Sequence, residues 1–228
     1  MFDGRFRAPI ERAVKPVGDT LRRTRLTPDQ LTMAGLVLAV AAAVTIGAGY
    51  LLAGFILVVL AALPDMLDGA LAKAAGASSQ RGAYFDSVAD RVTDMLLFGG
   101  VAWFFAADDR GVLTMLPVAV MGLSTLISYQ RAKAESLGLE AKGGLMERAE
   151  RIILLCLGLL IPVLLVPILW VMLALTAFTA VQRFVRVWNQ ANAATVVLER
   201  QAARRQRRIA RRSARSRRWS ELRRNRGV

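Results

Sequence analysis

Four aspartates between residues 65 and 90 stand at a fixed spacing, D-x2-D-G-x2-A-K-x8-G-x3-D-x3-D, which begins at Asp65 and ends at Asp90. Asp65 and Asp68 are three residues apart and Asp86 and Asp90 are four apart, so each pair would lie on one face of a helix. If the two helices are neighbours, four carboxylates converge, and one or two divalent cations relieve their repulsion. The spacing therefore predicts a metal centre that binds a phosphate or pyrophosphate group.

The residues around these aspartates fit such a ligand. Gly69 and Gly82 have no side chain, so a ligand or a neighbouring helix can approach closely. Lys73 supplies a cation for a phosphate oxygen one turn beyond Asp68. The chain has no histidine, so the metal ligands must be oxygen atoms, which favours Mg²⁺ or Mn²⁺. For the nearby Asp94, a structural role competes with a role in the site.

The composition indicates a membrane setting. Hydrophobic residues make up 55% of the chain and the mean hydropathy is +0.41, yet the net charge is +14. A soluble domain does not combine these values, whereas a membrane domain with basic ends does. The single cysteine, Cys156, lies in an apolar run and has no partner, which excludes a disulfide.

Six apolar runs predict an all-α integral membrane protein, a bundle of six transmembrane helices in one domain over residues 30–190. With its flanking turns each run can cross ~30 Å of hydrocarbon, because a helix rises about 1.5 Å per residue. The second run is long enough only if its helix continues through Asp65 and Asp68 towards Lys73. These carboxylates would then lie within the membrane, where charged side chains are costly and usually functional. The runs are Leu31–Ala48, Leu51–Leu63, Val88–Phe105, Val112–Tyr129, Ile152–Leu165 and Ile168–Val187.

Both ends of the chain lie outside these runs. Residues 1–29 lack the apolar core of a cleavable signal peptide, and apolar residues recur in them at helical spacing among basic ones. This pattern predicts an amphipathic juxtamembrane helix in the membrane interface; an ordinary helix packed on the domain is the alternative. Residues 191–228 form an Arg-rich tail, with 13 Arg against 2 Glu from Glu199 to Val228. Anionic membrane lipids are the favoured partner of the tail, and nucleic acid is unlikely because only Trp219 is aromatic.

The distribution of Lys and Arg predicts the orientation of the bundle. The connections at 49–50 and at Pro167 carry no charge and the connection at 108–110 carries one Arg, whereas those at 64–87 and 131–151 and both ends contain several basic residues. By the positive-inside rule, both termini and the carboxylate segment face the cytoplasm. The predicted location is the cell (inner) membrane, as a multi-pass protein.

The aspartate segment resembles the signature of the CDP-alcohol phosphotransferase family, D-x2-D-G-x2-A-R-x8-G-x3-D-x3-D, and departs from it only at Lys73. Lysine keeps the charge but not the bidentate fork of arginine. The resemblance implies a homodimeric phosphatidyltransferase, which moves a substituted phosphate from a CDP-linked lipid to an alcohol and releases CMP. It also implies that Asp65, Asp68 and Asp86 bind two divalent ions, and that Asp90 is both a metal ligand and the general base.

Within that family, most of residues 20–190 is similar to bacterial phosphatidylinositol phosphate synthases. The segments S-Y-Q-R-A-K-A-E, E-R-A-E-R and V-Q-R, which begin at Ser128, Glu147 and Val181, resemble their S-Y-x-K-A-R-A-E, E-R-P-E-R and V-Q-R. This similarity implies CDP-diacylglycerol as the donor and inositol phosphate as the acceptor. The residues implied in acceptor-phosphate binding are Arg131, Lys133, Arg148, Arg151 and Arg183. Those implied in CDP-lipid binding are Asp29, Gln30, Leu31, Thr32, Gly69, Lys73 and Ser79.

Two other functions remain open from the sequence. The same chemistry with glycerol phosphate as the acceptor would make the chain a phosphatidylglycerophosphate synthase. A non-catalytic membrane scaffold or a transporter, anchored by the basic tail, is a function of another class. Basic residues at the cytoplasmic ends of spans also orient helices without binding any substrate.

Overall fold

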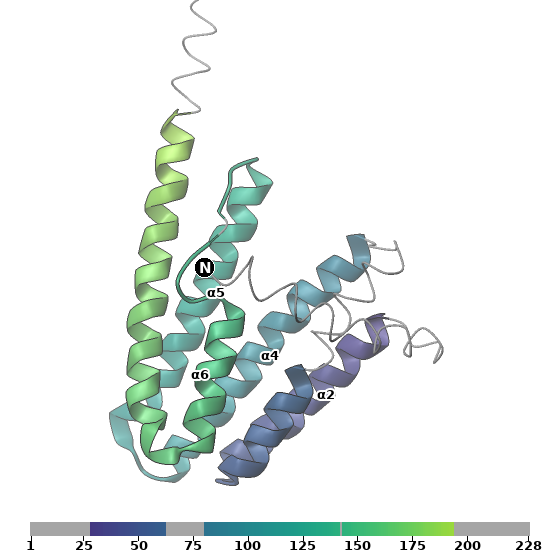
Figure 1. Ribbon diagram of the computed structural model, residues 1–228, viewed down its shortest axis with the longest axis vertical. Helices are drawn as coiled ribbons and strands as arrows, with labels where there is room; N and C mark the ends of the chain where they lie inside the picture. Colours follow the sequence, from purple (N-terminus) through teal and green to yellow (C-terminus); the bar gives the residue numbers. More distant parts are fainter. Residues whose placement is uncertain (1–27, 63–79, 142, 194–228) are drawn as a thin grey trace, which may run out of the picture.

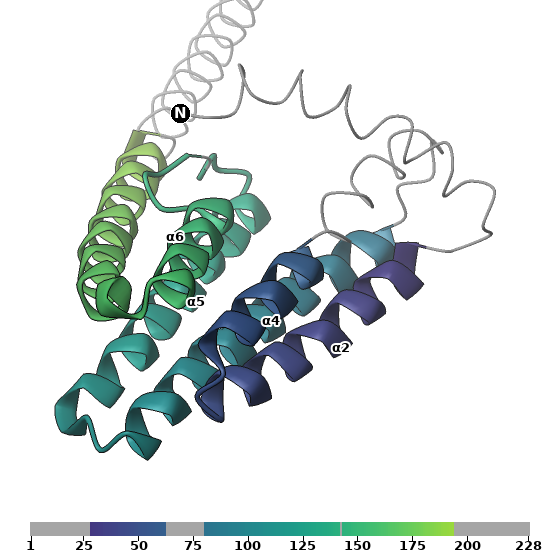
Figure 2. The same cartoon turned by 60° about the horizontal axis from the view of Figure 1, so that its bottom comes forward.

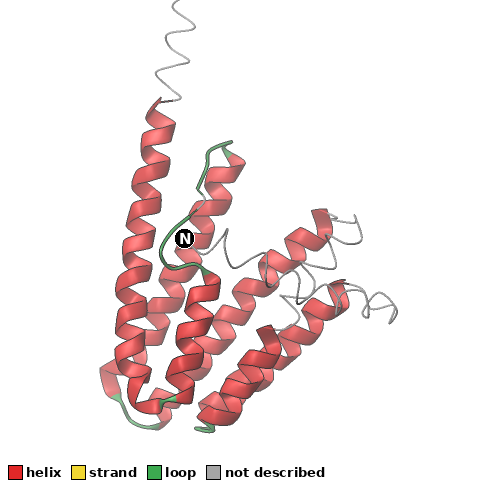
Figure 3. Cartoon of the chain, in the orientation of Figure 1, coloured by secondary structure: helices red, strands yellow, loops and turns green. Residues whose placement is uncertain are grey.

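The computed structural model describes residues 28–62, 80–141 and 143–193 (Figure 1). Within these ranges the chain forms helices, turns and loops, and no strand (Figure 3). Both parts of the chain expected to lie outside the bundle fall almost wholly beyond the described residues. So do five of the residues singled out from the sequence: Asp65, Asp68, Gly69, Lys73 and Ser79.

The described helices confirm an all-α architecture that includes helices able to cross a membrane. Three of them, Asp29–Gly47, Gly111–Ser136 and Pro162–Ala193, are long and apolar enough to cross a membrane, and Leu51–Ala62 is a shorter apolar helix. The first belongs to α2 (Pro28–Gly47) and the second contains α5 (Met115–Ser136). The other two described helices are α4 (Gln80–Ala107) and α6 (Arg148–Leu160), both of which begin with charged residues and continue as apolar ones.

Helix α4 is the element against which the others are arranged. In both Figure 1 and Figure 2, α2 and the Leu51–Ala62 helix lie on one side of it, and α5, α6 and the last helix lie together on the other. The contact with α2 is close because Gly100 has no side chain: a Cβ there would lie 2.6 Å from the carbonyl oxygen of Ala43. The apolar half of α4 supplies Leu97, Phe98 and Phe105 to the buried core.

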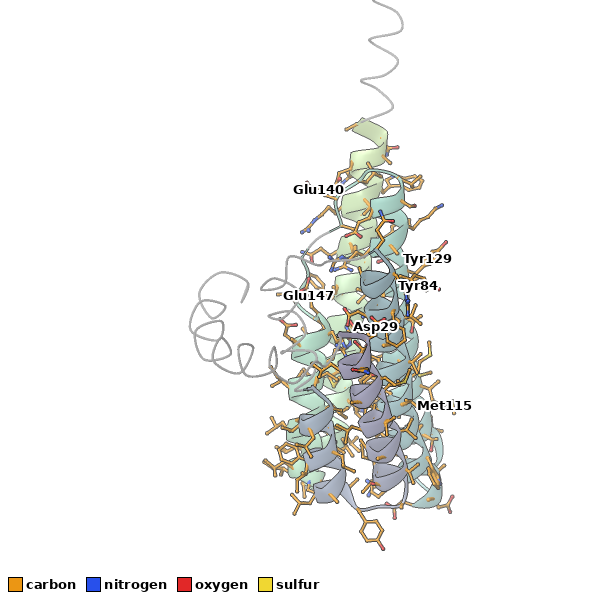
Figure 4. The ribbon with its side chains drawn as sticks, turned by 90° about the vertical axis from the view of Figure 1, so that its right-hand side faces the viewer. Asp29, Tyr84, Met115, Tyr129, Glu140 and Glu147 are labelled. Carbon is orange, nitrogen blue, oxygen red and sulfur yellow. The ribbon has the colours of Figure 1, made fainter. Side chains whose placement is uncertain are left out.

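The polar residues of the bundle gather at one end. Figure 4 shows Asp29, Tyr84, Tyr129, Glu140 and Glu147 in the upper half of the molecule, and Met115, at the start of α5, in the lower half. Successive helices therefore run in alternating directions between a polar end and an apolar end. The turns at the apolar end at residues 48–50 and 161–164 carry no charge, whereas the turn at 108–110 carries two Asp and one Arg.

The break between the last two apolar runs differs from the prediction. The sequence places the connection around Pro162 and Pro167, with the two runs divided at Pro167, but α6 ends at Leu160 and a short 3₁₀ turn occupies Pro162–Leu164. Pro162 begins that turn because it has no N–H to donate to the preceding helix. Pro167 lies in the first turn of the next helix, where a missing N–H costs nothing, so the predicted break there was wrong.

Candidate functional site

Three aspartates follow one another along one face of α4, at the polar end of the bundle. Asp86, Asp90 and Asp94 are four residues apart, so their side chains lie on successive turns of the helix. The side chain of Asp90 is 20% exposed and that of Asp94 is 5% exposed. The depth of these carboxylates therefore increases from the polar end towards the apolar core.

Asp90 lies where three helices meet. Its Oδ1 forms an ion pair with Nη1 of Arg148, on α6, at 2.6 Å. Its Oδ2 lies 3.3 Å from Nη2 of Arg91, the next residue on α4. Nη1 of Arg91 in turn contacts the hydroxyl of Ser128 on α5. The carboxylate of Asp90 is thus held between two guanidinium groups.

Asp94 is the second carboxylate in this arrangement and is buried. Its Oδ2 accepts a hydrogen bond from Nη2 of Arg151 at 2.7 Å, and its Oδ1 lies 3.7 Å from Nε of Arg148. Arg148 therefore bridges Asp90 and Asp94. We call Asp90, Asp94, Arg91, Arg148 and Arg151 the carboxylate–guanidinium network.

Local sequence signals place Arg148 and Arg151 in the first turn of α6. Helix α5 stops because Gly138 adopts a positive φ of 72°, and the N–H of Leu139 returns to the carbonyl of Ala134 at 2.9 Å. Helix α6 then starts with a capping box, in which Glu150 accepts a hydrogen bond from the backbone N–H of Glu147 at 3.1 Å. The two basic residues follow this cap at its first and fourth helical positions.

The last helix holds the loop between α5 and α6. Arg183 donates to the carbonyl oxygens of Ile127 at 3.0 Å and Gly143 at 3.2 Å, and its Nη2 lies 3.9 Å from Glu147. Near the end of the same helix, Gln190 exchanges two hydrogen bonds with the backbone of Glu140, at 3.0 and 2.8 Å. The first turn of α6 is thereby fixed against α5 and the last helix together.

Four of the five cations expected to bind an acceptor phosphate lie in one region. The charge of Arg183 interacts with those of Arg131 and Arg151, and Arg148 shares Asp94 with Arg151. Arg131 is exposed and paired with Glu135 at 3.0 Å, while Lys133 is exposed on the same helix. Nε of Arg151 and of Arg183 are buried and have no hydrogen-bond acceptor among the described residues. Buried donors of this kind normally have a partner, so an anionic ligand would suit them.

The residues expected to bind a CDP-lipid begin at the same end. Asp29, in the first turn of α2, pairs with Arg81, in the first turn of α4, at 3.2 Å. Leu31 and Thr32 are buried, whereas Gln30 is exposed. Asp29 thus contacts the start of α4, at a different point from the carboxylate–guanidinium network.

The donor atoms present fit a hard divalent cation. Asp86 and Asp90 offer carboxylate oxygens one turn apart, which is the ligand type that Mg²⁺ and Mn²⁺ prefer. In residues 28–62, 80–141 and 143–193, no three His, Cys, Asp or Glu side chains are grouped closely enough to hold a metal. The other two predicted ligands, Asp65 and Asp68, are outside these ranges.

Two residues of the site did not emerge from the sequence. Arg91 was not singled out, although its position directly after Asp90 was a signal. Glu147 marks the start of α6 and approaches Arg183; the capping pattern Glu147-x-x-Glu150 could have located it.

Comparison with known proteins gives concordant results. The family model described as CDP-alcohol phosphatidyltransferase matches residues 25–188. The phosphatidylinositol phosphate synthase of Mycobacterium marinum is 33% identical over 202 residues, which cover 84% of this chain and 86% of that protein. The crystal structure of the Mycobacterium tuberculosis phosphatidylinositol phosphate synthase with CDP-DAG bound is 35% identical, with a TM-score of 0.72 over 78% of this chain and 94% of that one. The structure of that enzyme with manganese and citrate has a TM-score of 0.71, over 77% and 88% of the two chains.

Proposed function

We propose that this chain, which belongs to the CDP-alcohol phosphatidyltransferase family, transfers the phosphatidyl group of CDP-diacylglycerol to inositol phosphate and releases CMP. As a member of that family it is a membrane transferase. The observation that favours a phosphorylated acceptor is the placement of Arg148 at 2.6 Å from Asp90, and the similarity to phosphatidylinositol phosphate synthases supports inositol phosphate as that acceptor. A cation suited to the acceptor phosphate thereby lies beside the carboxylate suited to deprotonate the acceptor.

Asp90 acts as the general base in this proposal. Its carboxylate takes the proton from the acceptor hydroxyl as the oxygen attacks the phosphatidyl phosphorus. The bond between that phosphorus and the CMP oxygen breaks, and CMP leaves with the electron pair. Arg91 and Arg148 hold the two oxygens of Asp90 from opposite ends, which keeps the carboxylate oriented.

Asp65, Asp68, Asp86 and Asp90 are the proposed ligands for Mg²⁺ or Mn²⁺, with two ions in the site. When bound, the cations polarise the phosphoryl group and neutralise the charge that develops on it. The manganese complex of the Mycobacterium tuberculosis enzyme supports a divalent cation in a relative. Chelation with EDTA should abolish CMP release, and added Mg²⁺ or Mn²⁺ should restore it; full activity in EDTA would refute the metal centre.

The acceptor site in this proposal uses cations from the end of α5, the start of α6 and the second half of the last helix. Arg131, Lys133, Arg148, Arg151 and Arg183 bind the acceptor phosphate. Such a group of cations stabilises an anionic acceptor, and an uncharged alcohol such as free inositol gains little from it. The CDP-lipid is held at the starts of α2 and α4 and by the residues between them, through Asp29, Gln30, Leu31, Thr32, Gly69, Lys73 and Ser79.

The arrangement in the membrane is also a proposal. Six spans place both termini and the site on the cytoplasmic side of the cell (inner) membrane, where a water-soluble acceptor and CMP exchange freely. The alternating helices support this orientation, as do the turns at the apolar end, among which only the turn at 108–110 carries a basic residue, Arg110. We further propose a homodimer, an N-terminal helix in the membrane interface over residues 1–29, and contact of the Arg-rich tail (191–228) with anionic lipids.

The acceptor assay tests the proposal directly. Purified protein receives labelled CDP-diacylglycerol with inositol phosphate, glycerol phosphate or free inositol, and the lipid product is identified. We expect product with inositol phosphate. Product with glycerol phosphate alone would instead make the chain a phosphatidylglycerophosphate synthase, which the same group of cations would also suit. No CMP release with any acceptor would favour a non-catalytic scaffold or a transporter.

A further inference from the structure

Asp94 is the buried carboxylate that contacts both guanidinium groups at the start of α6. We infer that Asp94 is a positioning residue for the acceptor-phosphate site: it holds Arg148 and Arg151 in the orientation in which their remaining N–H groups meet a phosphate. This inference rests on the proposed function. The sequence leaves two roles open for Asp94, a structural role and a role in the site, and this inference assigns it the second.

Asp94 uses one oxygen in a hydrogen bond and the other in a longer ion pair, while Oδ1 has no hydrogen-bond donor among the described residues. Oδ2 is 2.7 Å from Nη2 of Arg151, and Oδ1 faces Nε of Arg148 at 3.7 Å. The side chains of Asp94 and Arg151 are 5% and 3% exposed. A carboxylate this deeply buried between two guanidinium groups is well placed to fix the planes of both arginine side chains.

The position of the two arginines explains why such an anchor is needed. Arg148 and Arg151 stand in the first turn of α6, where the partial positive charge of the helix N-terminus disfavours cations. They also repel each other, because they lie three residues apart on one face. Asp94 offsets both effects from the neighbouring helix, and its hydrogen bond to Nη2 of Arg151 does not involve Nε of that residue.

The contacts of Arg151 show which of its N–H groups remain for a ligand. Nη2 binds Asp94, and Nη1 lies 3.4 Å from the carbonyl oxygen of Met146. Nε is buried and has no acceptor among the residues that the structure describes. A guanidinium has five N–H groups in a rigid plane, so fixing one edge determines where the others point. A phosphate oxygen is the acceptor that these donors suit.

Whether Asp94→Asn tightens or weakens anion binding distinguishes an effect of the charge of Asp94 from a positioning role. If Asp94 acted only through its charge, Asp94→Asn would raise the local positive potential and tighten the binding of an anion. If it positions the arginines, the same substitution weakens the binding despite the more favourable potential. Loss of one charge-assisted hydrogen-bond arrangement corresponds to about a ten- to hundredfold rise in Kd.

The experiment compares three variants with the wild-type protein in detergent. They are Asp94→Asn, Asp94→Glu, which keeps the charge, and the control Asp108→Asn. Asp108 is an exposed aspartate just beyond the far end of α4 that pairs with Arg110 at 2.7 Å. Calorimetry measures Kd for inorganic phosphate in the absence of CDP-lipid, and steady-state kinetics measure kcat and KM for inositol phosphate and CDP-diacylglycerol.

We expect Asp94→Asn to raise Kd for phosphate and KM for inositol phosphate about ten- to hundredfold, with KM for CDP-diacylglycerol within about twofold of wild type. Asp94→Glu should recover part of the loss, and Asp108→Asn should change neither value. Unchanged or tighter phosphate binding by Asp94→Asn would overturn the inference, as would wild-type protein that binds no phosphate. Wild-type protein that binds phosphate but releases no CMP would refute the proposed function and leave the phosphate comparison to decide the role of Asp94.

Discussion

The pair between Asp94 and Arg151 supports a quantitative prediction about stability. The substitution Arg151→Met removes the guanidinium and keeps an unbranched side chain of similar length. Asp94 then remains charged in a site where its side chain is 5% exposed. Removal of one partner of a buried ion pair costs about 3–5 kcal/mol of stability, because the other charge stays buried without compensation.

The structure places the expected value at the lower end of that range. Nε of Arg148 remains 3.7 Å from Oδ1 of Asp94 after the substitution. At an effective dielectric constant of 20, two unit charges about 4 Å apart still attract by roughly 4 kcal/mol before desolvation is subtracted. We therefore expect Arg151→Met to lower the free energy of unfolding by about 3 kcal/mol. For a chain of this size, that corresponds to a fall of roughly 6–12 °C in Tm.

A double variant distinguishes the stability cost of an unpaired charge from the cost of lost packing. In Asp94→Asn/Arg151→Met the buried carboxylate is gone and Arg148 keeps its pair with Asp90, so the double variant should be more stable than Arg151→Met alone, by about 1–2 kcal/mol. Tryptophan fluorescence during thermal unfolding of the detergent-solubilised protein measures Tm for both single variants, the double variant and wild type. A double variant that is no more stable than Arg151→Met would refute the reasoning, because the loss would then come from packing.

Three further outcomes follow from other parts of the structure. Gly100→Ala should cost about 1–3 kcal/mol, because its Cβ would meet the Ala43 carbonyl at 2.6 Å, whereas Gly99→Ala, with no atom within 4 Å, should be neutral or slightly stabilising in the same thermal assay. Arg131→Ala should raise KM for inositol phosphate about tenfold and leave Tm unchanged, because its pair with Glu135 is a surface pair; equal losses with CDP-diacylglycerol would contradict its assignment to the acceptor. Deletion of residues 200–228 should weaken sedimentation with anionic liposomes and leave kcat intact; unchanged sedimentation would remove the proposed lipid contact of the tail.

The sequence predicted those features that depend on spacing along the chain. The interval between Asp86 and Asp90 predicts a shared helix face, and α4 presents them so. The apolar runs predict the helices, because a helix in a membrane must satisfy its own backbone hydrogen bonds. The resemblance at E-R-A-E-R picked out Arg148 and Arg151, which begin α6.

The features that depend on contacts between distant residues were not predictable. The partners Asp94 and Arg151 are far apart in sequence, and no local pattern pairs one carboxylate with one of several arginines. The contact between Arg91 and Ser128 is of the same kind. The break at Pro162 rather than Pro167 was missed for a local reason: a proline stops one helix or starts the next according to where the helix begins.

The central claim is that Asp90, held between Arg91 and Arg148, is the base of a phosphatidyl transfer, and CMP release by Asp90→Asn tests it most directly. The substitution keeps the shape of the side chain but removes its capacity to accept the proton. We predict a loss of about 10²- to 10⁴-fold in CMP release, while metal-dependent binding of CDP-diacylglycerol is largely retained. Turnover near the wild-type rate would contradict the account.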